Sequence, residues 1–105
     1  MAKLSAAGRL VMFLVDSPHA RVSYSLGGGF SPSVIASMER GHGTKSNPRA
    51  DTVLKLIDVG VLKGAEFADL ELTDKGRRIL AEQQACGWEL VTETGRKPRM
   101  EQRKG

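Results

Sequence analysis

The chain has 105 residues and a formal net charge of +4, from 16 lysines and arginines and 12 acidic residues; 40% of its residues are apolar and 27% are charged. This length suits one small domain, which argues against a two-domain enzyme, and the apolar fraction argues against disorder throughout. The single cysteine, Cys86, cannot form an internal disulfide, so we expect a cytoplasmic protein. The longest apolar run, residues 10–15, is far shorter than the roughly 20 residues that span a bilayer, and no membrane partner is expected.

The charges are segregated along the chain. Residues 1–50 carry six basic and two acidic groups, residues 51–95 carry five basic and nine acidic groups, and residues 96–105 carry five basic groups and one acidic group. Clustered cations favour polyanion binding because they release the counterions condensed on phosphates. The pattern predicts that a nucleic acid would contact the first half of the chain and its basic end, although a merely solvated surface would also explain it.

Apolar residues at three- and four-residue steps predict a helix over Ser5–Asp16. Pro18 ends it, because a proline disfavours helical geometry in the residue before it. The next segment, residues 19–26, is ambiguous: its apolar residues alternate as in a strand, while its flanking residues also suit a short helix. Three glycines at 27–29 end this element in either case.

Two helices with start and stop signals are predicted next. In the first, over residues 31–40, Ser31 is the N-cap, Pro32 the first helical residue and Gly41 the stop. The second covers Arg49–Val59. Its outer side presents three polar residues on one stripe, and a polar loop precedes it. We expect partner contacts on this stripe and loop, at Arg49, Thr52 and Lys55 on the helix and at Lys45, Ser46 and Asn47 in the loop.

The remaining pattern predicts a short hairpin over residues 61–72 and a final helix from the capping residue Thr73 to Gln84. The apolar pattern then decays, and residues 96–105 are expected to form a mobile basic tail. The order helix, helix, helix, hairpin, helix predicts a mainly α fold with a small β-hairpin. We expect one domain over residues 1–85 and a C-terminal extension over residues 86–105.

The segments SPSVIASM, RADTVLKLIDVGVLKG and ADLELTDKGRRILAE resemble the winged helix-turn-helix regulators of the MarR and PadR kind. The resemblance implies a tri-helical core that binds DNA. Residues 31–40 would be the positioning helix, Arg49–Val59 the recognition helix and residues 65–69 the tip of the wing. Gly76 would let the outgoing helix pack closely.

A second resemblance overlaps the first. GFSPSVIASMERG and NPRADTVLKLIDVGVL resemble the helix-turn-helix of phage repressors, which implies that residues 31–40 are the recognition helix and residues 21–26 the helix before it. Only the winged register accounts for LTDKGRRIL, but its wing would carry Glu66 and Asp69 where a phosphate-binding wing carries basic residues. In the phage-repressor register the DNA contacts would be Ser31, Ser33, Ser37 and Arg40.

No other chemistry is indicated. His19, His42 and Cys86 lack metal-ligand spacing, and no catalytic set or cofactor motif is present, so we expect no enzyme, metal or cofactor. The prediction is a sequence-specific regulator of transcription that binds double-stranded DNA, similar to small phage, plasmid or bacterial repressors. Trp88, Leu90 and Val91 could pack on the core or on a second subunit, and together with the resemblance they imply a homodimer. The alternative is a winged-helix adaptor for a protein partner, which the acidic residues 51–95 would suit.

Overall fold

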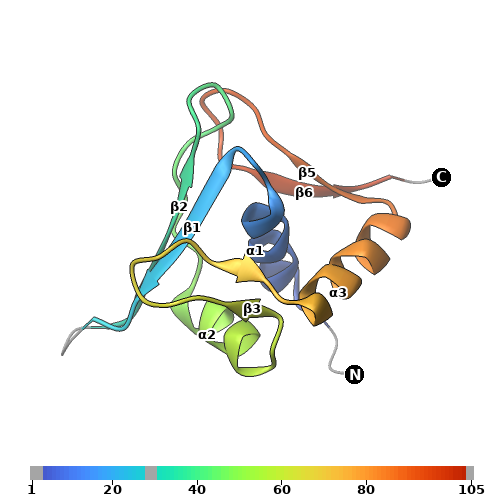
Figure 1. Cartoon of the computed structure of the whole chain (residues 1–105). Helices are drawn as coiled ribbons and strands as arrows, with labels where there is room; N and C mark the ends of the chain where they lie inside the picture. The colour runs from blue at the N-terminus through green and yellow to red at the C-terminus, as the bar shows by residue number, and fades with distance from the viewer. Residues whose placement is uncertain (1–3, 28–30, 104–105) are drawn as a thin grey trace.

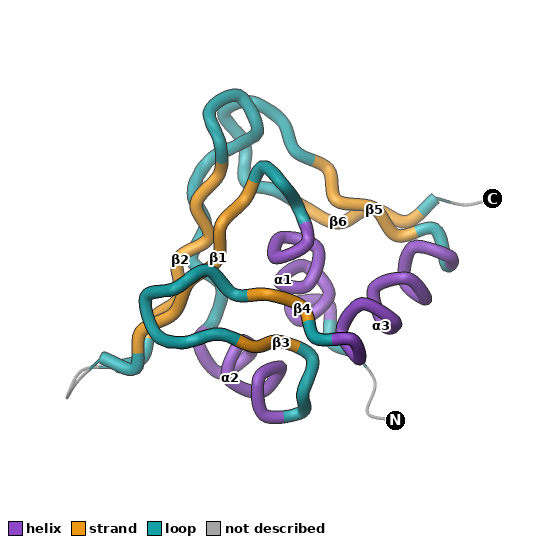
Figure 2. Tube along the Cα trace, viewed as in Figure 1, coloured by secondary structure: helices purple, strands orange, loops and turns teal. Residues whose placement is uncertain are grey.

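The computed structural model describes residues 4–27 and 31–103, which form three helices and three two-stranded antiparallel sheets (Figure 1; Figure 2). No strand links one sheet to another within this described part. The elements in chain order are α1 (Ala6–Asp16), β1 (Ala20–Ser25), β2 (Ser33–Met38), α2 (Ala50–Asp58), β3 (Leu62–Lys63), β4 (Glu71–Leu72), α3 (Asp74–Ala85), β5 (Trp88–Val91) and β6 (Arg99–Gln102).

Helix α1 lies at the centre of the molecule and packs against β1, α2, β4 and β5 (Figure 1). Its residues Met12 and Leu14 are fully buried. The helix predicted at this position is confirmed. The Ser5 side chain caps it by accepting the Gly8 N–H at 3.0 Å, and Ser17, extended before a proline, ends it.

The β1–β2 hairpin resolves the ambiguous segment after α1 as a strand. Six cross-strand pairs run from Ala20 opposite Met38 to Ser25 opposite Ser33. Side chains alternate between the two faces of a strand, and the inner face here contributes Val22, Val34 and Ala36 to the core.

The helix predicted over residues 31–40 is wrong, because Ser33–Met38 form β2. Val34 and Ala36 are buried while Ile35 between them is exposed, which is the period of a strand. The β-branched Val34 and Ile35 favour this conformation, and Pro32 is tolerated just before a strand as well as at the start of a helix. Pairing with β1 therefore overrides the capping pattern.

This strand also corrects the fold class. The positioning helix implied by the winged helix-turn-helix resemblance is absent, because it falls on β2. Both helices implied by the phage-repressor resemblance are absent, because they fall on β1 and β2. The chain is accordingly a mixed fold of helices and hairpins rather than mainly α, and the described residues hold no helix-turn-helix.

The predicted hairpin and final helix are confirmed. Leu62 of β3 pairs with Leu72 of β4, although each strand has only two residues. Thr73 caps α3 by accepting the Gly76 N–H at 3.1 Å, and its hydroxyl donates back to the Gly60 carbonyl. The close packing expected at Gly76 is present, since a Cβ there would lie 2.2 Å from the carbonyl oxygen of the β3-flanking Val61.

The C-terminal extension contains a hairpin where a structureless tail was expected. β5 pairs with β6, and Trp88, Leu90 and Met100 pack against the core. Arg9 of α1 lies over the Trp88 ring, with its guanidinium carbon 4.0 Å from the ring centre. This hairpin has little signal in the sequence, because Met100 is the one apolar residue of β6. Trp88 and Leu90, which had suggested a dimer interface, are thus used within the chain.

Candidate nucleic-acid interface

The outer face of the β1–β2 hairpin is accessible. The side chain of Arg21 is 81% exposed, and Ile35 is 42% exposed. Serine hydroxyls both donate and accept hydrogen bonds, so this face combines polar groups of both kinds with one cation and one apolar side chain. Its members are the cross-strand pairs Arg21–Ser37, Ser23–Ile35 and Ser25–Ser33.

The segment that follows β2 extends this face on one side. Ala36 and Ser46 exchange two backbone hydrogen bonds, with N···O distances of 2.9 and 3.0 Å. The bridge turns Ser46 inward, where its hydroxyl oxygen is buried without a hydrogen-bond partner. The neighbours Lys45 and Asn47 are exposed on the outer face.

The two basic regions of the sequence meet at this side of the molecule. The Thr44 N–H donates to the Arg96 carbonyl at 2.9 Å, and the Thr94 hydroxyl donates to the Gly41 carbonyl at 3.0 Å. Gly43 permits this approach, since its φ is +130° and a Cβ would lie 2.7 Å from the Arg96 carbonyl oxygen. We call the cations beside this junction the basic edge: Arg40, Lys45, Arg96 and Lys97.

Most of the basic edge is free to meet an anion. Within residues 4–27 and 31–103, Arg40, Lys45 and Lys97 form no ion pair. The Nε of Arg96 lies 3.8 Å from a carboxylate oxygen of Glu93, a loose and exposed contact. Exposed pairs of this kind contribute little, so Arg96 also remains available.

The neighbouring Arg99 differs, because it is engaged by two carboxylates. It donates to Glu93 at 3.2 Å and to Glu101 at 2.9 Å. These hydrogen bonds lower the pKa of Glu93 and raise the pKa of Arg99. Arg99 therefore fixes the turn between β5 and β6 and is not counted in the basic edge.

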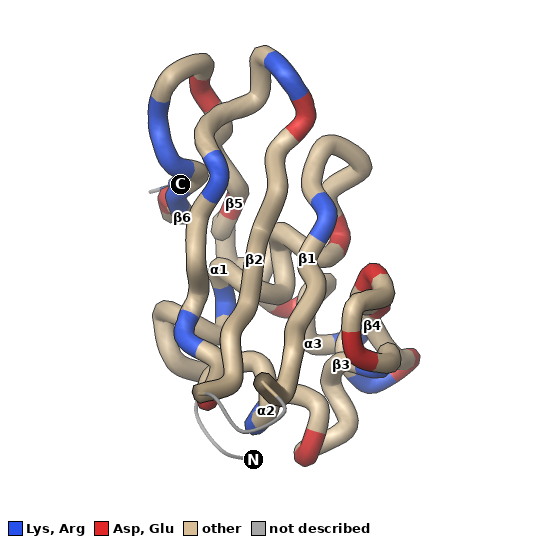
Figure 3. Tube along the Cα trace, turned by 90° about the vertical axis from the view of Figure 1, so that its left-hand side faces the viewer, with Lys and Arg blue, Asp and Glu red and all other residues tan. Residues whose placement is uncertain are grey.

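One group of acidic residues flanks the other edge of the hairpin. Figure 3 shows acidic positions around β3 and β4, while Glu39 and Glu93 lie in the segments that carry the basic edge. The β3–β4 loop carries Glu66 and Asp69, and it lies along β1 through a 2.9 Å hydrogen bond from the Phe67 N–H to the Tyr24 carbonyl. Arg21 lies 4.0 Å from Asp69. An acidic loop repels phosphate, so the hairpin that resembled a wing is an unsuitable DNA contact.

The predicted recognition helix does not present a basic face. Arg49 precedes α2, and its guanidinium lies 3.3 Å from the carboxylate of Asp51. Thr52 and Lys55 line a cleft of about 760 Å³ between α1, α2 and α3. Asp51 and Asp58 are exposed on the same short helix, which offsets its single lysine.

The structure thus separates the predicted contact residues. Ser46 points inward, Arg49 lies beside Asp51, and Thr52 and Lys55 line the cleft between the helices. Ser31 is exposed just before β2. The residues brought together on the outer face and the basic edge are Ser33, Ser37, Arg40, Lys45 and Asn47.

One constellation escaped the sequence reasoning. His19 Nδ1 lies 2.8 Å from Glu39 Oε2, and the His19 and His42 rings stack with their centres 3.8 Å apart. Spacing along the chain gave no sign of it, because the three residues meet only through the antiparallel pairing of β1 with β2. Only a correct prediction of that strand pairing would have placed these three residues together.

Comparison of the chain with models of protein families, with curated proteins and with solved structures gives no match. Among the described residues, no helix combines the length and the apolar character needed to cross a membrane.

Proposed function

We propose that this protein binds double-stranded DNA through the outer face of the β1–β2 hairpin and the basic edge, and that it acts as a regulator of transcription. The observation that carries the proposal is the junction that joins cations from two distant parts of the sequence, with Arg40, Lys45 and Lys97 unpaired among the described residues. Unpaired, clustered cations are the electrostatic requirement for binding to phosphates.

The hairpin supplies a means of reading sequence. The major groove of B-DNA admits a two-stranded β-ribbon, and serine hydroxyls bond to the edges of several bases. The outer-face pairs Ser23–Ile35 and Ser25–Ser33 would enter the groove, where Ile35 suits a thymine methyl group. The basic edge, at the side of β2, would then contact the adjacent phosphate backbone and fix the register.

The test compares two double charge reversals. Lys45→Glu with Lys97→Glu removes two members of the basic edge, and Lys55→Glu with Lys63→Glu makes the same change in charge on α2 and β3. Fluorescence anisotropy on a random-sequence duplex should show a large loss of affinity for the first variant. The slope of its log binding constant against log salt concentration should also become shallower, by the equivalent of about two phosphate contacts. The second variant should bind nearly as the wild type does. The opposite ranking would place the DNA surface on α2 and refute the proposal.

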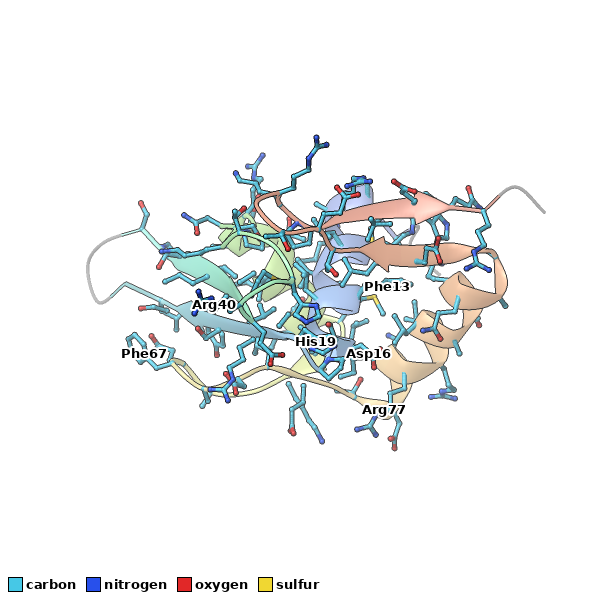
Figure 4. The ribbon with its side chains drawn as sticks, turned by 90° about the horizontal axis from the view of Figure 1, so that it is seen from above. Phe13, Asp16, His19, Arg40, Phe67 and Arg77 are labelled. Carbon is cyan, nitrogen blue, oxygen red and sulfur yellow. The ribbon has the colours of Figure 1, made fainter. Side chains whose placement is uncertain are left out.

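A protein-binding role is the second candidate, and Phe67 favours it. This side chain is 80% exposed and projects from the β3–β4 loop at the edge of the molecule (Figure 4). Its backbone has a φ of +63°, which is unusual for an aromatic residue. Leu26 is also exposed. It lies near Phe67, because the Leu26 N–H donates to the carboxylate of Glu66 in the β3–β4 loop. Failure of the wild type to bind duplex DNA at low salt would make this role the better account.

A further inference from the structure

The cluster of His19, Glu39 and His42 has the composition of a metal site. His19 lies just beyond the end of α1, close to Asp16 (Figure 4), and Glu39 directly follows β2. Each of the three residues has a ligand atom, and these atoms all lie within 4.8 Å of one another. Two imidazoles and one carboxylate form a ligand set used by zinc.

The backbone holds these residues in place. The Glu39 N–H donates to the His19 carbonyl at 2.8 Å, which continues the β1–β2 ladder by one more pair. The His42 N–H then donates to the Glu39 carbonyl at 3.0 Å, and Gly41 completes this turn with a φ of +90°. The turn returns the His42 ring onto the His19 ring, and the two planes differ by only 6°.

Coordination would require the two rings to turn out of their parallel stacking, because the lone pair of an imidazole nitrogen lies in the plane of its ring. Zinc–ligand bonds of about 2.0–2.1 Å put neighbouring atoms of a tetrahedral site roughly 3.3 Å apart. His19 Nδ1 and Glu39 Oε2, now 2.8 Å apart, need to separate by about half an ångström, while His42 needs to approach. The side chains of His19 and Glu39 are 45% and 60% exposed, so both can rotate without disturbing the core.

We propose that His19, Glu39 and His42 bind one divalent zinc-type cation at the end of the β1–β2 hairpin. Three protein ligands leave a fourth position open. A surface hollow of about 390 Å³, whose lining includes His19, Glu39, Arg21 and Ser37, adjoins the cluster and can hold water or a small anion in that position. The test of this proposal is independent of DNA binding, because it measures only the metal and needs no nucleic acid.

Calorimetric titration of the full chain with zinc chloride tests the proposal. The protein carries no histidine tag and is first treated with a chelator. We expect one zinc ion per chain, and we expect His19→Gln and His42→Gln each to weaken binding at least tenfold, since removal of a group that only hydrogen-bonds to a ligand already costs about 10–100-fold. Cobalt(II) serves as a spectroscopic probe, whose visible absorption should show nitrogen and oxygen ligands without a thiolate band.

Two controls separate this site from adventitious binding. Cys86→Ser removes the exposed thiol, and Glu66→Gln removes an exposed carboxylate in the β3–β4 loop; both should bind zinc as the wild type does. Circular dichroism establishes that each variant is folded. Absence of zinc binding by the wild type, unchanged affinity in both histidine variants, or loss of binding in Cys86→Ser would each overturn the proposal.

Discussion

At the scale of single residues, Gly76 shows how sequence and packing agree. Helix α3 approaches β3 so closely that a Cβ at this position would lie 2.2 Å from the carbonyl oxygen of Val61. The sequence resemblance had led us to expect a close approach at this glycine, although the family that it implied has no support in the fold. The close approach of α3 to Val61 explains the glycine at position 76 whether or not the chain belongs to that family.

Gly76→Ala should lower the free energy of unfolding by about 2 kcal/mol or more, because backbone rather than a flexible side chain must move. Urea denaturation measures the effect. Gly8→Ala in α1 is the matched control: its new methyl group would meet the Ser5 hydroxyl oxygen at 3.1 Å and the tip of the Leu4 side chain at 3.2 Å. A gain in helix propensity of about 1 kcal/mol offsets these contacts. Equal destabilisation of both variants would contradict this account of Gly76.

The pKa of Glu39 gives a second test at the residue scale. The hydrogen bond and positive charge of His19 hold this pKa below its usual value. The linked stabilisation is therefore present above the ordinary pKa of a glutamate and is lost as the pH falls through the lowered value. An NMR titration of the Glu39 carboxyl carbon should show a low midpoint that rises towards the normal value in His19→Gln. An unchanged midpoint would mean that this contact does not form in solution.

At the scale of elements, the sequence predicted those parts whose signals are local. The caps of α1 and α3 lie beside the residues that they cap, and the β3–β4 turn closes within ten residues. β2 was missed because a strand is decided by its partner, and its partner β1 was itself ambiguous. The candidate surface was predicted in part for the same reason: Arg40 and Lys45 both lie on it, but the helix that was to display Arg40 is strand β2.

Gly43→Ala tests the junction between elements without altering any charge. A side chain at this position would clash with the Arg96 carbonyl and strain a backbone of positive φ, so the turn after β2 should separate from the β5–β6 connection. Duplex affinity should fall. The slope of the log binding constant against log salt concentration should become shallower by the equivalent of about one phosphate contact, because Lys97 moves away from Lys45 and Arg40. Gly95→Ala is the control, since its φ of +78° is also strained while its Cβ would meet no neighbour. Equal losses in the two variants would attribute the effect to backbone strain alone.

At the scale of the whole molecule, folding brings together basic regions that are far apart in the sequence. Residues near 44 and 96 meet beside β2, while Glu66, Asp69 and Glu71 lie in the β3–β4 hairpin (Figure 3). The segregation was visible in the sequence, but its geometry was not, because the contact between the residues near 44 and those near 96 depends on a C-terminal hairpin with almost no pattern. The acidic β3–β4 hairpin also restricts the orientation in which the protein can approach a polyanion.

The salt dependence of duplex binding by the wild-type chain tests the central claim most directly. Each phosphate contact contributes about −0.9 to the slope of the logarithm of the binding constant against the logarithm of salt concentration. The four cations of the basic edge together predict a slope of about −3.6, and the Lys45→Glu, Lys97→Glu variant should bring it to about −1.8. No binding at low salt, or a slope near zero in the wild type, would contradict the account.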